Sequence, residues 1–160
     1  MGLAVSQVSL LAAAASGMCA ATLMAGLFQG LRLTGLMRLD PLLLVGTIFA
    51  APGPRARTIG LFWHVATGAA FGALYATLFE LFAVTPGLLP GLLFGLVHGL
   101  LSGLSLGTLP FRNRRVAVGE VADPGLFAAN LGWTDGAFLT LAHALYGGSF
   151  ALLFARLSAP

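Results

Sequence analysis

Charged side chains are scarce in this sequence, and lysine is absent altogether. Only 8% of the 160 residues are charged, and all eight basic residues are arginine. A water-soluble domain carries about 25% charged residues, so composition argues against a soluble globular domain. The arginines, which give a net charge of +3, lie between apolar runs. In that position they indicate membrane topology, and binding of nucleic acid is not expected.

Cysteine is almost absent as well. Cys19 is the single thiol, which excludes an internal disulfide bond and a cysteine-rich metal site. No charged side chain precedes Arg32, and this apolar run is too long for the short core of a signal peptide. We therefore expect a retained transmembrane helix at the start of the chain.

Long apolar runs are what the sequence has in abundance. Hydrophobic residues make up 58% of the chain, and the mean hydropathy is +0.95. A spanning helix needs about 20 mainly apolar residues, and four stretches qualify, namely 3–31, 58–84, 86–109 and 132–157. The sequence predicts an all-α polytopic membrane protein in which residues 1–160 form a single transmembrane domain.

Two further segments connect these spans. Residues 41–51 are apolar, but as a helix they reach only about 16 Å, half of a bilayer, so an interfacial or re-entrant helix is expected. Asp40 suits its N-cap and Pro41 its first turn. The polar segment 110–131 is either an ordered cap over the bundle or a solvated loop, and its polarity favours the loop.

The arginines predict an orientation. Seven of them fall in the connections after the first and third spans, whereas the connection around 85–89 carries no charge. The positive-inside rule places basic connections in the cytoplasm, which puts both termini outside. We expect a multi-pass protein of a bacterial inner membrane, surrounded by the lipid bilayer and forming a homo-oligomer or part of a larger membrane complex.

Glycines recur at every fourth position of two spans. The span 86–109 contains Gly91, Gly95, Gly99 and Gly103, and the span 58–84 contains Gly68 and Gly72. In lipid, small residues at this spacing let helices approach closely, so a glycine-packed bundle is expected. The spacing leaves open whether the partner helix lies in the same chain or in a second copy. The alternative is that the glycines line a pore.

All three histidines lie within predicted spans. Ionisable groups are costly in a bilayer and persist where they face a bundle interior, a partner or a ligand. His64, His98 and His143 are therefore candidate binding residues. At about 1.5 Å per residue, the last two are level near the bilayer centre and His64 is shallower. Supporting polar side chains are Ser102, Thr140, Tyr146 and Tyr75.

Three roles for the histidines are open. Facing imidazoles suit the axial positions of a non-covalent b-type haem, or a divalent metal. They also suit a proton relay in a small transporter, with Glu80 as the coupling carboxylate. The third role is interhelical hydrogen bonding, which favours an accessory or structural subunit, our leading hypothesis. No catalytic fingerprint is present, so an enzyme is not expected. Asp135, at the start of the last span, is expected to interact favourably with the dipole of that helix.

Three motifs carry a resemblance to a known family. They are His64-x-x-x-Gly68-x-x-x-Gly72-x-x-Tyr75, Gly95-x-x-His98-Gly99 and His143-x-x-Tyr146-Gly147. Together with the short Asp40–Pro41 helix, they resemble small, uncharacterised bacterial four-helix membrane proteins. The resemblance covers most of the chain and implies a four-span fold, but it implies no activity.

Overall fold

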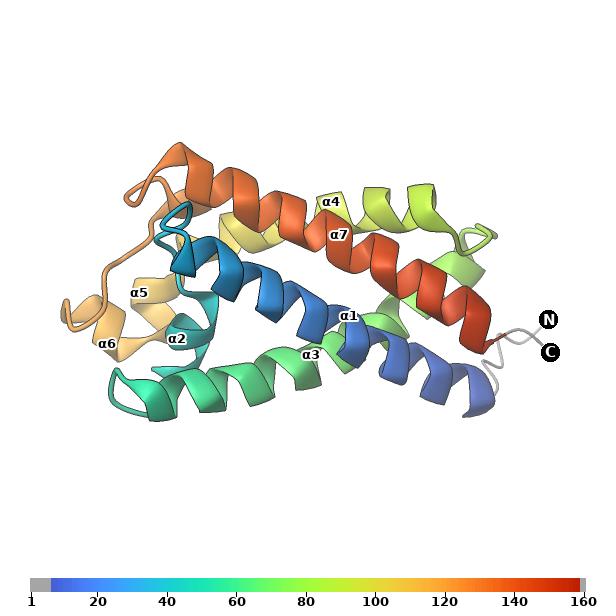
Figure 1. Cartoon of the computed structure of the whole chain (residues 1–160), viewed down its shortest axis with the longest axis horizontal. Helices are drawn as coiled ribbons and strands as arrows, with labels where there is room; N and C mark the ends of the chain where they lie inside the picture. The colour runs from blue at the N-terminus through green and yellow to red at the C-terminus, as the bar shows by residue number, and fades with distance from the viewer. Residues whose placement is uncertain (1–6, 159–160) are drawn as a thin grey trace.

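The computed structural model describes residues 7–158, and every regular element in that range is helical. The elements are α1 (Gln7–Leu33), α2 (Pro41–Gly46), α3 (Pro54–Leu81), α4 (Leu88–Leu106), α5 (Leu109–Arg112), α6 (Arg114–Ala117), the 3-10 helix η1 (Leu126–Ala128) and α7 (Trp133–Leu157) (Figure 1). The predicted start of the first span at Leu3 lies outside the described residues.

Four of these helices, α1, α3, α4 and α7, are long and apolar enough to cross a membrane. α4 packs along α7, α1 packs along α3, and α1 also contacts α7, so two helix pairs form one bundle (Figure 1). Large apolar side chains, among them Leu11, Phe62 and Leu101, are exposed on its outside. The predicted all-α fold with four membrane-spanning helices is confirmed.

The ends of α3 differ from the predicted range 58–84. The helix begins at Pro54. Proline suits the first helical position because the N–H that it lacks would have no hydrogen-bond partner within the helix there. Gly53, with a φ of 152°, turns the chain just before it. The helix ends at Leu81, close to Ala83 with its left-handed φ of 52°. Backbone turns therefore decide both ends, which hydrophobicity alone does not show.

α2 lies where the half-length helix is predicted, but with six residues it is shorter than predicted. The carboxylate of Asp40 caps it by accepting the N–H of Leu43 at 3.0 Å. The helix ends at Gly46, before the predicted end at Ala51, and the chain continues in turns. Glycine commonly ends helices, and Gly46 also packs so closely on α3 that a Cβ would collide with the carbonyl oxygen of Ala56.

The segment between α4 and α7 is fastened to the bundle at two points, as expected of an ordered cap, while many of its other side chains are exposed. Asn113 is 1% exposed, and its Nδ2 donates to the carbonyl of Leu44 at 3.0 Å and to the Thr47 hydroxyl at 2.9 Å. Phe127, with a φ of 49°, covers Gly103 of α4 so closely that a Cβ there would collide with its ring. One buried amide and one aromatic ring thus fasten the segment to the bundle.

Glycines allow the helices to approach closely. A Cβ at Gly91 or Gly95 would collide with backbone carbonyl oxygens of α7, and one at Gly99 would lie 2.8 Å from another. In the same way, a Cβ at Gly68 or Gly72 would collide with atoms of α1. The surfaces opposite these glycines therefore belong to the same chain, which answers the question that their spacing left open.

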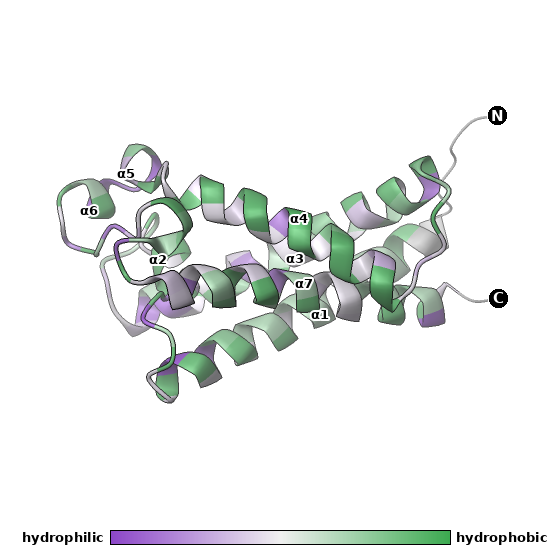
Figure 2. Cartoon of the chain, turned by 90° about the horizontal axis from the view of Figure 1, so that it is seen from above, coloured by the Kyte–Doolittle hydropathy of each residue, from purple (hydrophilic) through white to green (hydrophobic). Residues whose placement is uncertain are grey.

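The two ends of the bundle differ in polarity. α2, α5 and α6 gather at one end, whereas α1 begins and α7 finishes at the other (Figure 1). Hydrophilic residues concentrate around α2, α5 and α6 (Figure 2). This end, called here the arginine-rich end, carries Arg32, Arg38, Arg55, Arg57, Arg112, Arg114 and Arg115.

Candidate functional site

His98 and His143 are in contact inside the bundle. His98 projects from α4 and His143 from α7, and their ring centroids are 4.7 Å apart in a T-shaped arrangement. His98 also stacks on Phe71 of α3, with centroids 4.0 Å apart. His143 is buried and His98 is half-buried. The two histidines are therefore neighbours on adjacent helices, as their predicted depths indicate.

The hydrogen bonds of His143 define its tautomer. Nδ1 lies 2.8 Å from the carbonyl oxygen of Leu139, which can only accept, so Nδ1 carries the proton. Nε2 is then an acceptor, and the hydroxyl of Ser102 on α4 donates to it at 3.1 Å. This bond joins α7 to α4 in the interior.

His98 is bonded to α3. The hydroxyl of Tyr75 lies 3.2 Å from Nδ1 of His98. Tyr75 is buried and makes no other hydroxyl bond within the described range, so it donates and His98 carries its proton on Nε2. Nearby, Tyr146 of α7 donates to the carbonyl oxygen of Gly68 on α3 at 2.7 Å. Because these bonds join α3, α4 and α7 pairwise, we call Tyr75, His98, Ser102, His143 and Tyr146 the histidine–tyrosine network.

His64 lies beside this network in a different environment. Its ring is edge-on to Phe28 of α1, with centroids 6.3 Å apart. Its Nε2 is shielded from solvent and has no hydrogen-bond partner among residues 7–158. A cavity of about 200 Å³ between α1, α3, α4 and α7 is lined by all three histidines, together with Ser102 and Tyr146. The structure therefore brings these predicted residues to one place.

The geometry does not fit a haem held between His98 and His143. Axial imidazoles hold a metal between them with bonds of about 2 Å, whereas these two rings touch and leave no room for a porphyrin. The cavity of about 200 Å³ is also below the roughly 300–1,000 Å³ of pockets for drug-sized ligands. Within the described residues, no group of three or more histidine, cysteine, aspartate or glutamate side chains could hold a metal ion.

Two candidate site residues lie outside the network, namely Thr140, predicted as a supporting polar side chain, and Glu80, predicted as the coupling carboxylate. The hydroxyl of Thr140 donates to the carbonyl of Gly136 in its own helix at 2.9 Å. Glu80 is exposed and lines a separate hollow of about 420 Å³ with Thr85 and Ser158, at the end opposite to the arginine-rich end. The residues that line the histidine cavity include no carboxylate, so Glu80 and the histidines do not form one site.

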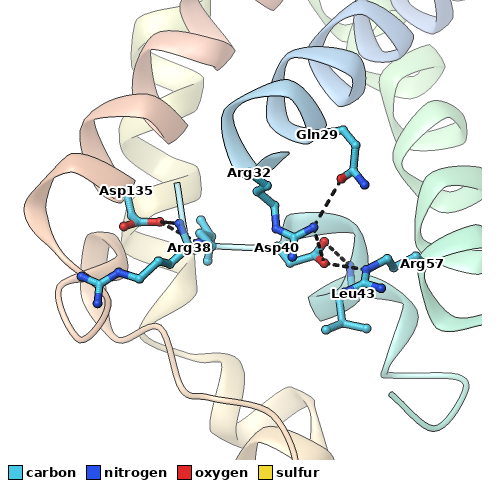
Figure 3. Close-up of polar contacts among 8 residues, drawn as sticks. Gln29, Arg32, Arg38, Asp40, Leu43, Arg57 and Asp135 are labelled. Atoms are coloured by element: carbon cyan, nitrogen blue, oxygen red, sulfur yellow. Dashed lines mark hydrogen bonds and ion pairs between the residues drawn. The ribbon is translucent and has the colours of Figure 1, made fainter. Parts of the chain in front are cut away.

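A second polar centre lies at the arginine-rich end, around Asp40. This side chain is 8% exposed, and its Oδ2 pairs with Nη1 of Arg32 at 2.9 Å and with Nε of Arg57 at 2.8 Å (Figure 3). Its Oδ1 accepts the N–H of Leu43. Asp40 was predicted as a helix cap, and its second role is to connect the ends of α1, α2 and α3.

Asp135 is the residue whose role the sequence analysis missed. Instead of serving only the helix dipole, its buried Oδ1 accepts the backbone N–H groups of Arg38 and Leu39 at 2.7 and 2.6 Å (Figure 3). The only signal in the sequence is a lone acid in the first turn of a span, level with a basic connection. That signal does not name the backbone that the acid binds.

No protein-family model, curated protein or solved structure matched the chain. The resemblance carried by the histidine and glycine motifs therefore stays a prediction. Function is inferred below from the contacts of the two polar centres.

Proposed function

We propose that this chain is a small integral membrane protein that serves as an accessory or structural subunit, held in shape by the histidine–tyrosine network. The observation that carries the proposal is the use of the imidazole nitrogens. Both nitrogens of His143 and Nδ1 of His98 are hydrogen-bonded within the bundle. In lipid, such bonds favour helix association, and they occupy these three nitrogens within the bundle.

The division of the chain between spanning helices and short connecting segments supports the same role. The four apolar helices take up most of the sequence, and the polar segments between them form short caps instead of a separate catalytic domain. Close glycine contacts between α4 and α7 and between α1 and α3 suit a rigid scaffold. A structural protein acts by binding other subunits, so we propose that this chain acts in a homo-oligomer or a larger membrane complex.

We further propose that the protein lies in a bacterial inner membrane with the arginine-rich end in the cytoplasm and both termini outside. The supporting observation is charge asymmetry, since seven of the eight arginines lie at one end. Trp133, the first residue of α7, is 82% exposed at that end, where an interfacial tryptophan is expected.

Removal of the imidazole that joins α3 to α4 tests the structural role. We expect His98→Leu to lower the free energy of unfolding by about 1–2 kcal/mol, because it leaves the buried Tyr75 hydroxyl without a partner. In a Tyr75→Phe background the same change is expected to cost about half as much, since the hydroxyl is already gone. The measurement is reversible unfolding in mild detergent by titration with a denaturing detergent.

Thr77→Val is the matched control, because within the described part of the chain the Thr77 hydroxyl bonds only to the carbonyl of Ala73 in its own helix, at 3.0 Å. This variant should unfold like the wild type. Equal stability of His98→Leu and the wild type, or fully additive effects of the two network substitutions, would contradict a structural role for the histidine.

The orientation can be tested with single cysteines in a Cys19→Ala background. Arg114 lies in α6 and Thr85 lies between α3 and α4, and both are exposed. In intact cells, a membrane-impermeant maleimide should label Thr85→Cys, whereas Arg114→Cys should react only after permeabilisation. The reverse pattern would overturn the proposed orientation and leave the fold unaffected.

A further inference from the structure

The histidine cavity has room for one small ring. Its volume is about 200 Å³, whereas a cavity of about 150 Å³ with apolar walls holds a benzene molecule. No carboxylate or guanidinium is among the residues that line it, and Ala21, Met24, Gly68 and Phe71 form the apolar part of the lining. Because a buried charge without a partner is costly, the occupant that suits this cavity is neutral and mainly apolar.

The cavity lies beside two helices that are not closely packed against each other. α3 and α4 follow one another in the chain, but α3 packs along α1 and α4 packs along α7. Between α3 and α4 the contacts are made by side chains, among them the stacked rings of Phe71 and His98. Thr67, which lines the cavity from α3, is exposed on the outside of the bundle. A lipid-soluble molecule therefore has its route to the cavity from the bilayer, between α3 and α4.

His98 supplies a hydrogen-bond donor to this cavity. Its Nδ1 accepts from the hydroxyl of Tyr75, so Nε2 carries the proton. Nε2 makes no hydrogen bond with residues 7–158 and, unlike Nε2 of His64, it is not closed off from solvent. Because His98 lines the cavity, this N–H is available to an acceptor atom of an occupant.

The other polar side chains that α4 and α7 contribute to the lining have already used their donors. The hydroxyls of Ser102 and Tyr146 donate to partners on neighbouring helices, and both ring nitrogens of His143 are bonded. The Thr67 hydroxyl of α3 donates to the backbone of its own helix at 2.9 Å. Within the described residues, His98 is therefore the side chain of α4 and α7 that offers the cavity a free donor, and a matching occupant brings an acceptor.

We propose that the histidine cavity binds the ring of a lipid-soluble quinone, with one carbonyl oxygen accepting the N–H of His98 Nε2. A quinone ring is neutral, has about the size of benzene and carries acceptors without donors, so it matches the volume, the lining and the free donor of the cavity. Phe71 and Met24 provide aromatic and sulfur contacts for the ring. An alkyl tail on the ring extends between α3 and α4 into the bilayer. This binding goes beyond the structural role proposed above.

The test compares two ligands, duroquinone and durene, which share a tetramethylated six-membered ring but differ in that durene has no carbonyl groups. Binding to the full chain is measured by equilibrium dialysis in mild detergent, as ligand retained beyond that in empty micelles. His98→Asn keeps an acceptor for Tyr75 and loses the donor at Nε2. We expect it to weaken binding of duroquinone about fivefold, through loss of one hydrogen bond, and to leave binding of durene unchanged. His98→Gln, whose amide N–H reaches towards the position of Nε2, should bind duroquinone more tightly than the asparagine variant.

A second variant tests the cavity without touching the histidine–tyrosine network. Thr67→Leu places a larger side chain in the lining and should weaken binding of both ligands about tenfold. Thr77→Leu is the matched control, because Thr77 is also exposed on α3, donates to its own helix at 3.0 Å and does not line the cavity. Its binding should match the wild type.

Three results would overturn the proposal. They are a wild-type protein that retains no duroquinone beyond empty micelles, equal binding by the two leucine variants, and equal weakening of duroquinone and durene in His98→Asn. The last result would mean that the asparagine changes the shape of the cavity and that Nε2 of His98 does not bond the carbonyl oxygen. Since neither leucine variant alters a bond of the network, the outcome does not depend on the unfolding experiments with His98→Leu.

Discussion

Gly95→Ala is expected to destabilise the protein strongly, although it adds a single methyl group. A Cβ at Gly95 would collide with the carbonyl oxygen of His143 and lie 2.9 Å from that of Ala144. Backbone atoms cannot rotate away as a flexible side chain can, so α4 must move off α7. Overpacking of a core costs about 1–3 kcal/mol, and we expect the upper part of that range.

Gly26→Ala provides the matched control for this result. Gly26 also lies within a spanning helix, α1, but a Cβ there meets nothing within 4 Å. Alanine is preferred over glycine inside helices by up to about 1 kcal/mol, so this variant should be as stable as the wild type or more so. Equal unfolding free energies for the two alanine variants, measured in mixed micelles, would argue against the close α4–α7 contact.

Asp135→Leu is expected to have the second large effect. Asp135 is 1% exposed and accepts two backbone N–H groups, of Arg38 and Leu39. Leucine has the same branched shape but accepts nothing, so one buried and one part-buried donor lose their partner. Each such loss costs about 1–3 kcal/mol, which gives a total of about 2–6 kcal/mol in the free energy of unfolding.

Asp135→Asn separates the effect of losing the hydrogen bonds from the effect of changing the size of the side chain. Its side-chain oxygen still accepts both N–H groups, so it should retain more than half of the stability lost in the leucine variant. Glu120→Gln should have little effect, because its side chain is 48% exposed and exposed ion pairs contribute little. If the leucine and asparagine variants unfold at the same denaturant concentration, the two amide bonds are not what holds the segment 38–39.

The four spans and the neighbouring positions of His98 and His143 follow from the sequence because both depend on simple periodicities. Hydrophobic runs determine which segments can span a bilayer, and a constant rise per residue places the two histidines at one depth. The start of α2 also depends on local sequence, since Asp40 caps the helix and Pro41 occupies its first position. These features need no knowledge of the rest of the chain.

The polar contacts at the arginine-rich end could not be predicted in the same way. Asn113 binds Leu44 and Thr47, which lie 69 and 66 residues earlier, and Asp135 binds a backbone 96 and 97 residues away. Such pairs depend on the path of non-periodic connections. The lack of a hydrogen-bond partner for Nε2 of His64 among residues 7–158 could not be predicted either, because the sequence gives the depth of this residue but not the contacts of its ring.

The packing pattern has a consequence for synthesis in the cell. α1 and α3 are complementary to each other, so this pair can associate as soon as α3 has entered the membrane. The glycine face of α4 instead has its partner surface on α7, which is synthesised after α4. Before α7 is in place, the glycine face of α4 is without its partner helix. The carboxylate of Asp135, which binds the backbone of residues 38 and 39, is missing as well. Completion of the bundle therefore requires α7, and a chain that stops before it exposes surfaces that favour aggregation and misassembly.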